Sequence, residues 1–585
     1  MQTAEKVLND TIRDIVITIG IGFIIGISTV FLSRMYEYLW ILRSIITGIS
    51  LPLTILCVIA GLTIAYLIVQ KFALKKETGC GTSQVIEAYH YERGYLSPRD
   101  FSSKTVASAV TIGFGGSAGL EGPSLLLGGG IASFIGQKTG LSPEKIRVFM
   151  VSGAAAGLSA IFKAPLTGIL FALEIPYRRY LAKEIFITAS LSSVTSYLTF
   201  IFFEGSEPLF PFSPVLTISL DNALYATIEG LLAAVVALFF IHFFRTVEKM
   251  RTNFKVHPII LPALGGLVVG SIGLMCPRIL GVGYDTIYSS ASGSLYDASM
   301  MFLVSLLIFK IIATSVTLNL GGSGGLFIPS IFVGAIMGVI FTKMLSIGPN
   351  EILVMAAMAA VIAATNKTLL TSIAFVAETC GPSSIISATI AACISYVASG
   401  SLSLYENQLV SKPEEEGEAL TQLRHLIQSN NFYRRKEIRV KEIMVRNPVT
   451  LDEGMSIEEA LAVAAQHEFR VYPVVNKWGG LIGTLKIEDL LSIPIEKWNL
   501  PISQTTIQAP LVALEEDSLY DIIEKMIQER RDHAYIVSDY HSMRPEGVVA
   551  GIDALRAFLK TILIEKTPKI VIQPYTRSRD PYEEP

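Results

Sequence analysis

The stretch Gly115–Pro123 reads Gly-Gly-Ser-Ala-Gly-Leu-Glu-Gly-Pro and decides the fold class of this chain. Its glutamate, Glu121, is the only ionisable side chain between Thr105 and Gln137. A lone carboxylate at the centre of a membrane helix costs about 2.5–3.5 kcal/mol, so membrane proteins retain one where it lines a polar cavity or a pathway. The surrounding glycines expose backbone N–H groups, which can bind an anion. The stretch therefore predicts an ion pathway with a carboxylate inside it.

Long runs without charge lie on both sides of this stretch. The chain of 585 residues is 51% hydrophobic and only 17% charged. A helix needs roughly 20 apolar residues to cross a hydrocarbon core, and several runs without Asp, Glu, Lys or Arg reach about that length. These runs are Ile15–Ser33, Ser44–Gln70, Ile185–Phe203, Ile311–Thr342 and Thr379–Tyr405. The predicted fold class is a polytopic α-helical membrane protein.

Other features exclude several classes of function. The N-terminal region lacks a small-residue cleavage site, so we interpret it as a retained membrane segment and not as a signal peptide. The five cysteines have neither pairing nor metal-ligand spacing. The net charge of -3, without a basic stripe, gives no sign of nucleic-acid binding. His467-Glu468 is followed by Phe-Arg-Val, so the His-Glu-x-x-His signature of a metalloprotease is absent and no enzyme is predicted.

The composition changes sharply after Tyr405, where a polar, glutamate-rich connection leads into a soluble part. Short β-branched runs alternate there with amphipathic helical stretches, twice over, which predicts a pair of α/β repeats. The tail is rich in Pro, Arg, Asp and Glu, and we expect it to become ordered only by contact with other groups. The predicted divisions are a membrane domain at 1–408, a linker at 409–439, α/β repeats at 440–494 and 505–565, and a tail at 566–585.

The membrane part also repeats itself. Gly115–Ser124 resembles Gly321–Ser330, and Lys163–Glu174 resembles Lys367–Glu378 with the same interval from Thr to Glu. Interrupted segments at matching positions of two halves indicate a repeat interface that holds the substrate near the middle of the membrane. Close helix packing by small residues would explain the glycines, but neither the repeated Gly-Gly-Ser nor the paired Thr and Glu. Sequence similarity leaves open whether the repeats are inverted.

The chain resembles a CLC chloride channel or transporter with a C-terminal pair of CBS domains. The resemblance rests on Gly119–Pro123, Gly324–Pro329 and the Leu-Tyr pair at 404–405, in that order, and covers nearly the whole chain. It implies a multi-pass homodimer in which each subunit has its own anion pathway of broken helices, with the CBS domains in the cytoplasm. The implied partners are chloride or other small anions, membrane lipid and, for an exchanger, protons. No cofactor is required.

The resemblance also implies the residues of the pathway. Glu121 matches the gating glutamate, whose carboxylate competes with the anion because helix N-termini that bind a halide also bind a tethered anion. Tyr405 matches the tyrosine whose hydroxyl contacts the central anion, although a tyrosine alone is as typical of a membrane interface. The other implied anion-binding positions are Cys80, Gly81, Gly119, Gly122, Leu326, Phe327 and Ile328.

Two positions depart from the family pattern. Cys80 replaces a serine, and because a thiol is a weaker donor than a hydroxyl the anion preference stays open, as does a plain packing role for Cys80. Ile175 stands where proton-coupled members commonly carry a glutamate, and it cannot hold a proton. The neighbouring Glu174 could replace the missing acid or cap a helix. We therefore predict a passive, gated channel, with a Cl-/H+ antiporter that lacks the usual internal glutamate as the alternative.

CBS pairs resemble adenosine-nucleotide sensors. Their ribose-binding pattern begins with Gly, has a Ser or Thr in the middle and ends with Asp. The first and last residues of the pattern are present at Gly483–Asp489 and at Gly547–Asp553, but the Ser/Thr position holds Lys486 in one repeat and Ala550 in the other. Binding of ATP, ADP or AMP is one hypothesis, and a purely structural dimerising module is the other. A CBS-regulated magnesium carrier would show acidic clusters near the membrane, and the membrane half has few. The candidate nucleotide-binding residues are Asp489, Lys486, Tyr472, His533 and Asp553.

Overall fold

The computed structural model describes residues 2–210, 220–253, 257–411, 438–467, 469–491, 493, 497–505, 507–529 and 531–557. The chain forms two compact units, Met1–Lys412 and Pro413–Pro585. Most of the predicted linker, the last residues of the second predicted repeat and the whole predicted tail at 566–585 lie outside the described residues.

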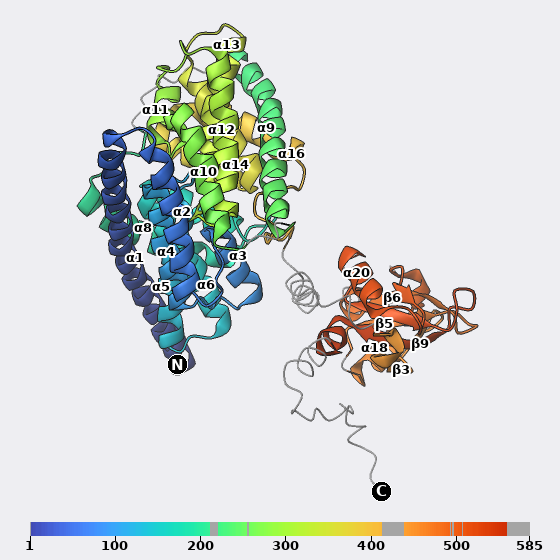
Figure 1. Ribbon diagram of the computed structural model, residues 1–585. Helices are drawn as coiled ribbons and strands as arrows, with labels where there is room; N and C mark the ends of the chain where they lie inside the picture. Colours follow the sequence, from blue (N-terminus) through green and yellow to red (C-terminus); the bar gives the residue numbers. More distant parts are fainter. Residues whose placement is uncertain are drawn as a thin grey trace. The chain divides into compact units, whose positions relative to one another are not determined.

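The first unit is helical (Figure 1); among its long helices, α1 contacts α2 and α9 contacts α12. Two short strands, β1 (Gly79–Cys80) and β2 (Ser323–Gly324), pair in parallel inside it. The helices are α1 (Gln2–Ile49), α2 (Leu53–Phe72), α3 (Gly81–Tyr91), α4 (Pro98–Gly113), α5 (Glu121–Lys138), α6 (Pro143–Phe162), α7 (Pro165–Glu174), α8 (Phe186–Glu204), α9 (Leu220–Asn253), α10 (Ile260–Met275), α11 (Tyr284–Ala291), α12 (Met300–Asn319), α13 (Phe327–Met344), α14 (Glu351–Asn366), α15 (Leu369–Cys380) and α16 (Ile385–Ala398).

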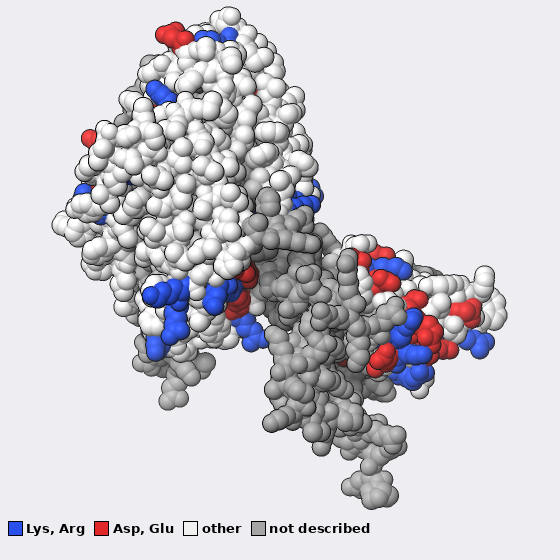
Figure 2. Space-filling view, in the orientation of Figure 1, with Lys and Arg blue, Asp and Glu red and all other residues white. Residues whose placement is uncertain are grey.

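The surface of this unit matches a membrane environment. Seven of the described helices are long and apolar enough to cross a membrane by length and composition. On the face drawn in Figure 2, charged side chains gather toward the two ends of the unit and leave its middle almost uncharged. Shorter apolar helices such as α7 and α15 are too short to cross a membrane by themselves, so the backbone groups at their ends need partners from the protein.

Two of the charge-free runs do not correspond to single helices. Ser44–Gln70 is divided between α1 and α2 around Pro52, because proline disfavours the helical conformation of the residue before it. Ile311–Thr342 is divided between α12 and α13 by the glycine-rich stretch Gly321–Gly325, in which Gly321 has a φ of 117° that other residues rarely adopt. Each of these two runs, although long enough to cross a membrane, is therefore divided between two helices.

The two halves of the first unit pack alike. Helix α5 packs on α6 as α13 packs on α14, and α1 packs on α8 as α9 packs on α16. Between the halves, α7 contacts α15, α2 contacts α10, and β1 pairs with β2. The internal repeat predicted from Gly115–Ser124 and Gly321–Ser330 thus corresponds to two structurally related sets of helices.

The second unit contains two similar α/β repeats. In the first, β4 pairs in parallel with β5 and β5 pairs antiparallel with β6; β7, β8 and β9 repeat this order, and β3 extends the second sheet beside β9. Ser456 begins α18 through a capping box with Glu459. The elements are β3 (Val445–Arg446), β4 (Leu451–Asp452), α18 (Ile457–Ala465), β5 (Val471–Val475), β6 (Leu481–Lys486), α19 (Ile487–Leu491), β7 (Val512–Ala513), α20 (Leu519–Glu529), β8 (His533–Val537) and β9 (Pro545–Ala550).

Candidate functional site

Glu121 is the first residue of α5 and is completely buried. Its Oε1 accepts a hydrogen bond of 2.6 Å from the backbone N–H of Phe327, the first residue of α13. Its Oε2 has no hydrogen-bond partner among the described residues. The carboxylate of one half of the repeat is therefore bound to the helix N-terminus of the other half, where the partial positive charge of the helix favours an anion.

Glycines make room for this carboxylate. Gly119 and Gly325 form an antiparallel bridge, and the N–H of Gly119 donates to the carbonyl of Gly325 over 3.0 Å. A Cβ atom on either glycine would run into the carboxylate of Glu121. The glycine-rich loops are thus needed for space around the carboxylate, and not only for helix packing.

Three helices begin around Glu121: α3, α5 and α13. The residues before them, Cys80, Leu120 and Leu326, provide no side-chain hydrogen bond to cap them. A Cβ on Gly81 would meet the carbonyl of Gly122, so the starts of α3 and α5 are in direct backbone contact. The first N–H groups of a helix lack intrahelical partners, and three such ends together can bind an anion.

Tyr405 is completely buried close to this group of helix N-termini. It lies within electrostatic range of both Glu121 and the partly buried Cys80. Its hydroxyl and that of Thr82 make no hydrogen bond to a described residue within normal geometry. The arrangement offers an anion the hydroxyls of Tyr405 and Thr82 in addition to backbone N–H groups.

Aromatic rings fix the start of α13. Phe327 is completely buried, with its ring centroid 5.3 Å from Phe162, 6.0 Å from Phe171 and 5.3 Å from Phe375. Its neighbours Leu326 and Ile328 are also completely buried. The N–H groups of this segment are therefore held by packing, while its side chains exclude water from one side of the site.

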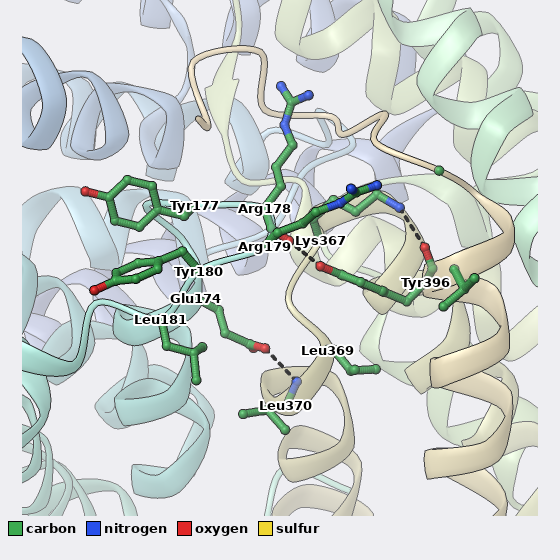
Figure 3. A pocket seen from close by; sticks show the side chains of 12 residues that line it. Glu174, Tyr177, Arg178, Arg179, Tyr180, Leu181, Lys367, Leu369, Leu370 and Tyr396 are labelled. Carbon is green, nitrogen blue, oxygen red and sulfur yellow. Dashed lines mark hydrogen bonds between the residues drawn. The ribbon is translucent and has the colours of Figure 1, made fainter. Parts of the chain in front are cut away.

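Two other carboxylates cap helices across the repeat. Glu174, at the end of α7, accepts from the N–H groups of Leu370 and Thr371 and from the Thr371 hydroxyl, over 2.8, 2.8 and 2.7 Å (Figure 3). Glu378, near the end of α15, accepts from Leu166 and from Thr167 in the same way, over 2.9, 2.7 and 2.7 Å. Because each helix end caps the start of the other helix, α7 and α15 lie antiparallel, as inverted repeats require.

Ile175 directly follows α7 and is buried, 2% exposed. Its side chain places no titratable group at the position where the family resemblance predicts the inner part of a proton route. Both oxygens of the adjacent Glu174 are engaged by α15. In this structure Glu174 is a capping carboxylate.

Two buried charges were missed in the sequence. Lys310 is completely buried in α12, donates to the carbonyls of Ile279 and Gly281 over 3.1 and 3.0 Å, and lies within electrostatic range of Glu121. Glu229 is completely buried in α9, and neither of its carboxylate oxygens has a partner among the described residues. The sequence pattern that pointed to Glu121 is also found at Lys310 and Glu229, because each of them is a lone charged residue within an apolar stretch.

The candidate nucleotide-binding residues occupy matching places in the two α/β repeats. Lys486 ends β6 and Asp489 follows it in α19; His533 begins β8, and Asp553 follows β9 and lies 3.9 Å from Arg556. Tyr472 is completely buried in the core of the first repeat with Leu451 and Leu485. That burial favours a core role for Tyr472 over contact with an adenine.

Comparisons with known proteins identify the family. The family described as "Voltage gated chloride channel" matches residues 60–400, more than half of the chain, and a CBS domain matches residues 440–496. The uncharacterised protein MJ0305 of Methanocaldococcus jannaschii is 31% identical over 326 residues, covering 56% of this chain and 78% of that protein.

Two further relatives have functional names. The voltage-gated ClC-type chloride channel ClcB of Citrobacter koseri is 27% identical, over 50% of this chain and 70% of its own length. The H+/Cl- exchange transporter ClcA of the same species is 29% identical, over 48% of this chain and 59% of its own length.

The crystal structure of a eukaryotic CLC transporter superposes with a TM-score of 0.61 at 19% identity, covering 93% of this chain and 98% of that chain. The predicted fold class, a CLC-type helical membrane protein with a C-terminal α/β CBS region, is thereby confirmed. The chain belongs to the CLC family of voltage-gated chloride channels and transporters: it is a multi-pass membrane protein that transports chloride, and not an enzyme.

Proposed function

We propose that this protein is a passive, gated chloride channel in which Glu121 is the gate, and that it works as a homodimer with one pathway in each subunit. The observation that carries the proposal is the single hydrogen bond from the N–H of Phe327 to Glu121. The carboxylate occupies the helix N-terminus that a chloride ion would otherwise bind, so the two anions compete for the same donors.

The gate can open at a small structural cost. Among the described residues, one backbone hydrogen bond of normal geometry holds the Glu121 carboxylate, its second oxygen has none, and the N–H groups of Glu121 and Ile328 lie near it. Protonation or displacement of the carboxylate would return the N–H groups of α13 to the anion. Tyr405 and the uncapped starts of α3 and α5 then supply the remaining donors of the proposed anion site.

Ile175 supports the choice of a channel over an exchanger. A group that accepts and releases protons on the inner side favours tight proton coupling, and the side chain of Ile175 is not such a group. Glu174 is a poor substitute, because protonation would weaken the three hydrogen bonds by which it caps α15. The similarity to ClcA keeps exchange as the alternative, with a proton route through water.

The reversal potential of the purified protein in liposomes tests this proposal. A chloride gradient is applied first and a pH gradient is then added. For a channel, the reversal potential follows the chloride gradient alone; a shift on adding the pH gradient would identify an exchanger.

The variant Glu121→Gln tests the gate in the same liposomes. Chloride flux should persist and lose its pH dependence, because the amide keeps the shape of the side chain without titrating. Glu144→Gln, at an exposed position at the start of α6, is the matched control and should behave as the wild type. Loss of chloride flux in a folded Glu121→Gln protein would contradict the assignment of the gate.

For the CBS region we propose binding of an adenine nucleotide, with Asp553 as a ribose contact. A bound nucleotide changes transport only if it binds two conformations of the protein with different affinity. Calorimetric titration of the full-length protein with ATP, ADP and AMP, repeated with Asp553→Ala, tests the site. If the wild type takes up none of the three, the CBS region is a structural module.

A further inference from the structure

Lys310, in α12, is a completely buried cation that the proposed gate does not use. Its ammonium group donates to the carbonyls of Ile279, Gly281 and Val282, over 3.1, 3.0 and 3.4 Å. It also lies 4.7 Å from the centroid of the Phe332 ring. An ammonium has three protons for these three acceptors and is attracted to the face of an aromatic ring, whereas a neutral amine has only two protons. The surroundings of Lys310 therefore fit its charged form.

The segment that supplies these carbonyls is shaped around the ammonium group. Gly281 and Gly283 both have left-handed backbone conformations, with φ values of 62° and 89°. A Cβ on Gly283 would run into the ring of Phe332 and lie 3.5 Å from the Nζ of Lys310. The N–H of Gly281 also donates to the carbonyl of Gly115 over 3.4 Å. The segment thus connects Lys310 with the glycine-rich stretch that leads to Glu121.

The charge of Lys310 has one charged neighbour. Among the described residues, Glu121 is the only charged group within electrostatic range of Lys310, and no ion pair joins this lysine to an acid. The three carbonyls solvate the ammonium group but carry no net charge to neutralise it. A buried cation without a counter-charge is costly, and the Glu121 carboxylate supplies that counter-charge while it is bound to Phe327.

Opening the gate removes this balance. When the Glu121 carboxylate is protonated or displaced, the positive charge of Lys310 stays buried, and a chloride ion at the start of α13 would restore the balance. The Phe332 ring, which lies against the ammonium group, belongs to α13, the same helix whose first N–H binds Glu121. One helix therefore holds both the neighbour of the cation and the anion donors.

We propose that Lys310 is the fixed counter-charge of the anion pathway. It does not touch the ion, and it acts through its positive charge, which favours an anion at the start of α13, first the Glu121 carboxylate and then chloride. The proposal rests on the proposed gate and extends it, because it makes Lys310 a positioning residue that sets the affinity for chloride and the pH at which the gate opens.

Other titratable groups around Glu121 do not supply a positive charge. Tyr284, at the start of α11, lies within electrostatic range of the carboxylate, as do Tyr405 and Cys80. Each of these three is uncharged in its protonated form. Of the charged side chains, Lys310 attracts the Glu121 carboxylate most strongly.

The test uses the purified full-length protein, with chloride binding measured by calorimetric titration and chloride flux measured in liposomes across a pH series. Lys310→Gln removes the charge and keeps an N–H donor for the carbonyls, whereas Lys310→Arg keeps the charge. The matched control is Arg43→Gln. Arg43 is a cation in α1, 9% exposed and 4.5 Å from the centroid of the Trp40 ring. Its electrostatic neighbours among the described residues are Cys57 and Tyr36, and not Glu121.

The decisive comparison is made in the Glu121→Gln background, where chloride has no carboxylate to compete with. There, Lys310→Gln should weaken chloride binding about tenfold or more, while Lys310→Arg and Arg43→Gln leave it close to that of Glu121→Gln alone. The double variant removes both buried charges, so it avoids the unpaired charge that destabilises a single variant.

The pH series separates a charge effect from a structural one. With Glu121 present, Lys310→Gln should move the pH of half-maximal flux upward by about one unit, because the carboxylate has lost its counter-charge and is protonated more readily. A purely structural role of Lys310 would not move this midpoint.

The proposal is overturned if Glu121→Gln binds chloride equally well with and without Lys310→Gln. An equal loss in Arg43→Gln or in Lys310→Arg overturns it too, because the charge at this position would then not be the cause. Failure of the proposed gate has a different signature, since the flux of Glu121→Gln would then keep its pH dependence. The comparison of chloride affinities in that background would still decide the role of Lys310.

Discussion

Glu121 and Glu174 are both buried carboxylates bound to the N-terminus of a helix from the other half of the repeat, yet they are held very differently. Glu121 accepts one hydrogen bond and keeps one oxygen without a described partner, whereas Glu174 accepts three. Glu378 repeats the pattern of Glu174. The number of donors, more than burial or charge, separates a carboxylate that can leave its site from one that is part of the framework.

The largest effect should follow from removing a crossed cap. Glu174→Ala leaves buried donors unpaired at the start of α15 and should lower the free energy of unfolding by about 3 kcal/mol or more. Glu378→Ala leaves partly buried or exposed donors unpaired at the start of α7 and should lower it by less. Thermal unfolding in detergent, read together with the elution profile, measures this. Glu121→Ala is the comparison and should destabilise far less; equal losses in all three variants would remove the distinction between gate and framework.

A smaller but more specific effect is expected from Gly119→Ala. The three atoms nearest to the added Cβ belong to the end of the Glu121 side chain, so the carboxylate should move away from α13 while the backbone stays in place. We expect chloride flux that no longer depends on pH, as in Glu121→Gln, although the titratable group is retained. Flux measurements in liposomes across a pH series test this, and pH dependence like that of the wild type would show that the carboxylate still reaches Phe327.

The smallest effect concerns Cys80. Replacing its thiol by a hydroxyl in Cys80→Ser strengthens one donor near Tyr405, worth about 1 kcal/mol at most, or roughly fivefold. The chloride-to-nitrate permeability ratio, taken from reversal potentials, should shift within that range. Cys393→Ser, in α16, is the control. An unchanged ratio would make Cys80 a packing residue.

Local pattern was enough to predict some of these features and not others. A lone carboxylate among glycines pointed to Glu121, and the doubled Gly-Gly-Ser pointed to the repeat. The paired Thr and Glu were also visible in the sequence. The sequence did not show that Glu174 caps the helix that contains Thr371, or that Glu378 caps the helix that contains Thr167. That pairing depends on how the halves pack, which residue spacing within one half does not encode.

Apolar composition predicted which segments lie in the membrane, but it was less informative about where one helix ends and the next begins. A charge-free run marks residues that tolerate lipid or a protein core, and it takes no account of where the backbone turns. Pro52 and Gly321 decide the breaks inside two such runs. The search for charge-free runs also overlooked Lys310, because this residue lies between two apolar runs and belongs to neither.

The crossed caps have a consequence for how the chain is made. The ribosome makes Thr167, in the first turn of α7, 211 residues before Glu378, the carboxylate that caps this helix. Until then the start of α7 lacks its protein partner, and an unpaired N–H group in lipid costs several kcal/mol. The N-terminal half of the membrane domain therefore cannot settle on its own during insertion. We therefore expect α7 to reach its final position only when α15 is present, so that the two halves complete their folding together.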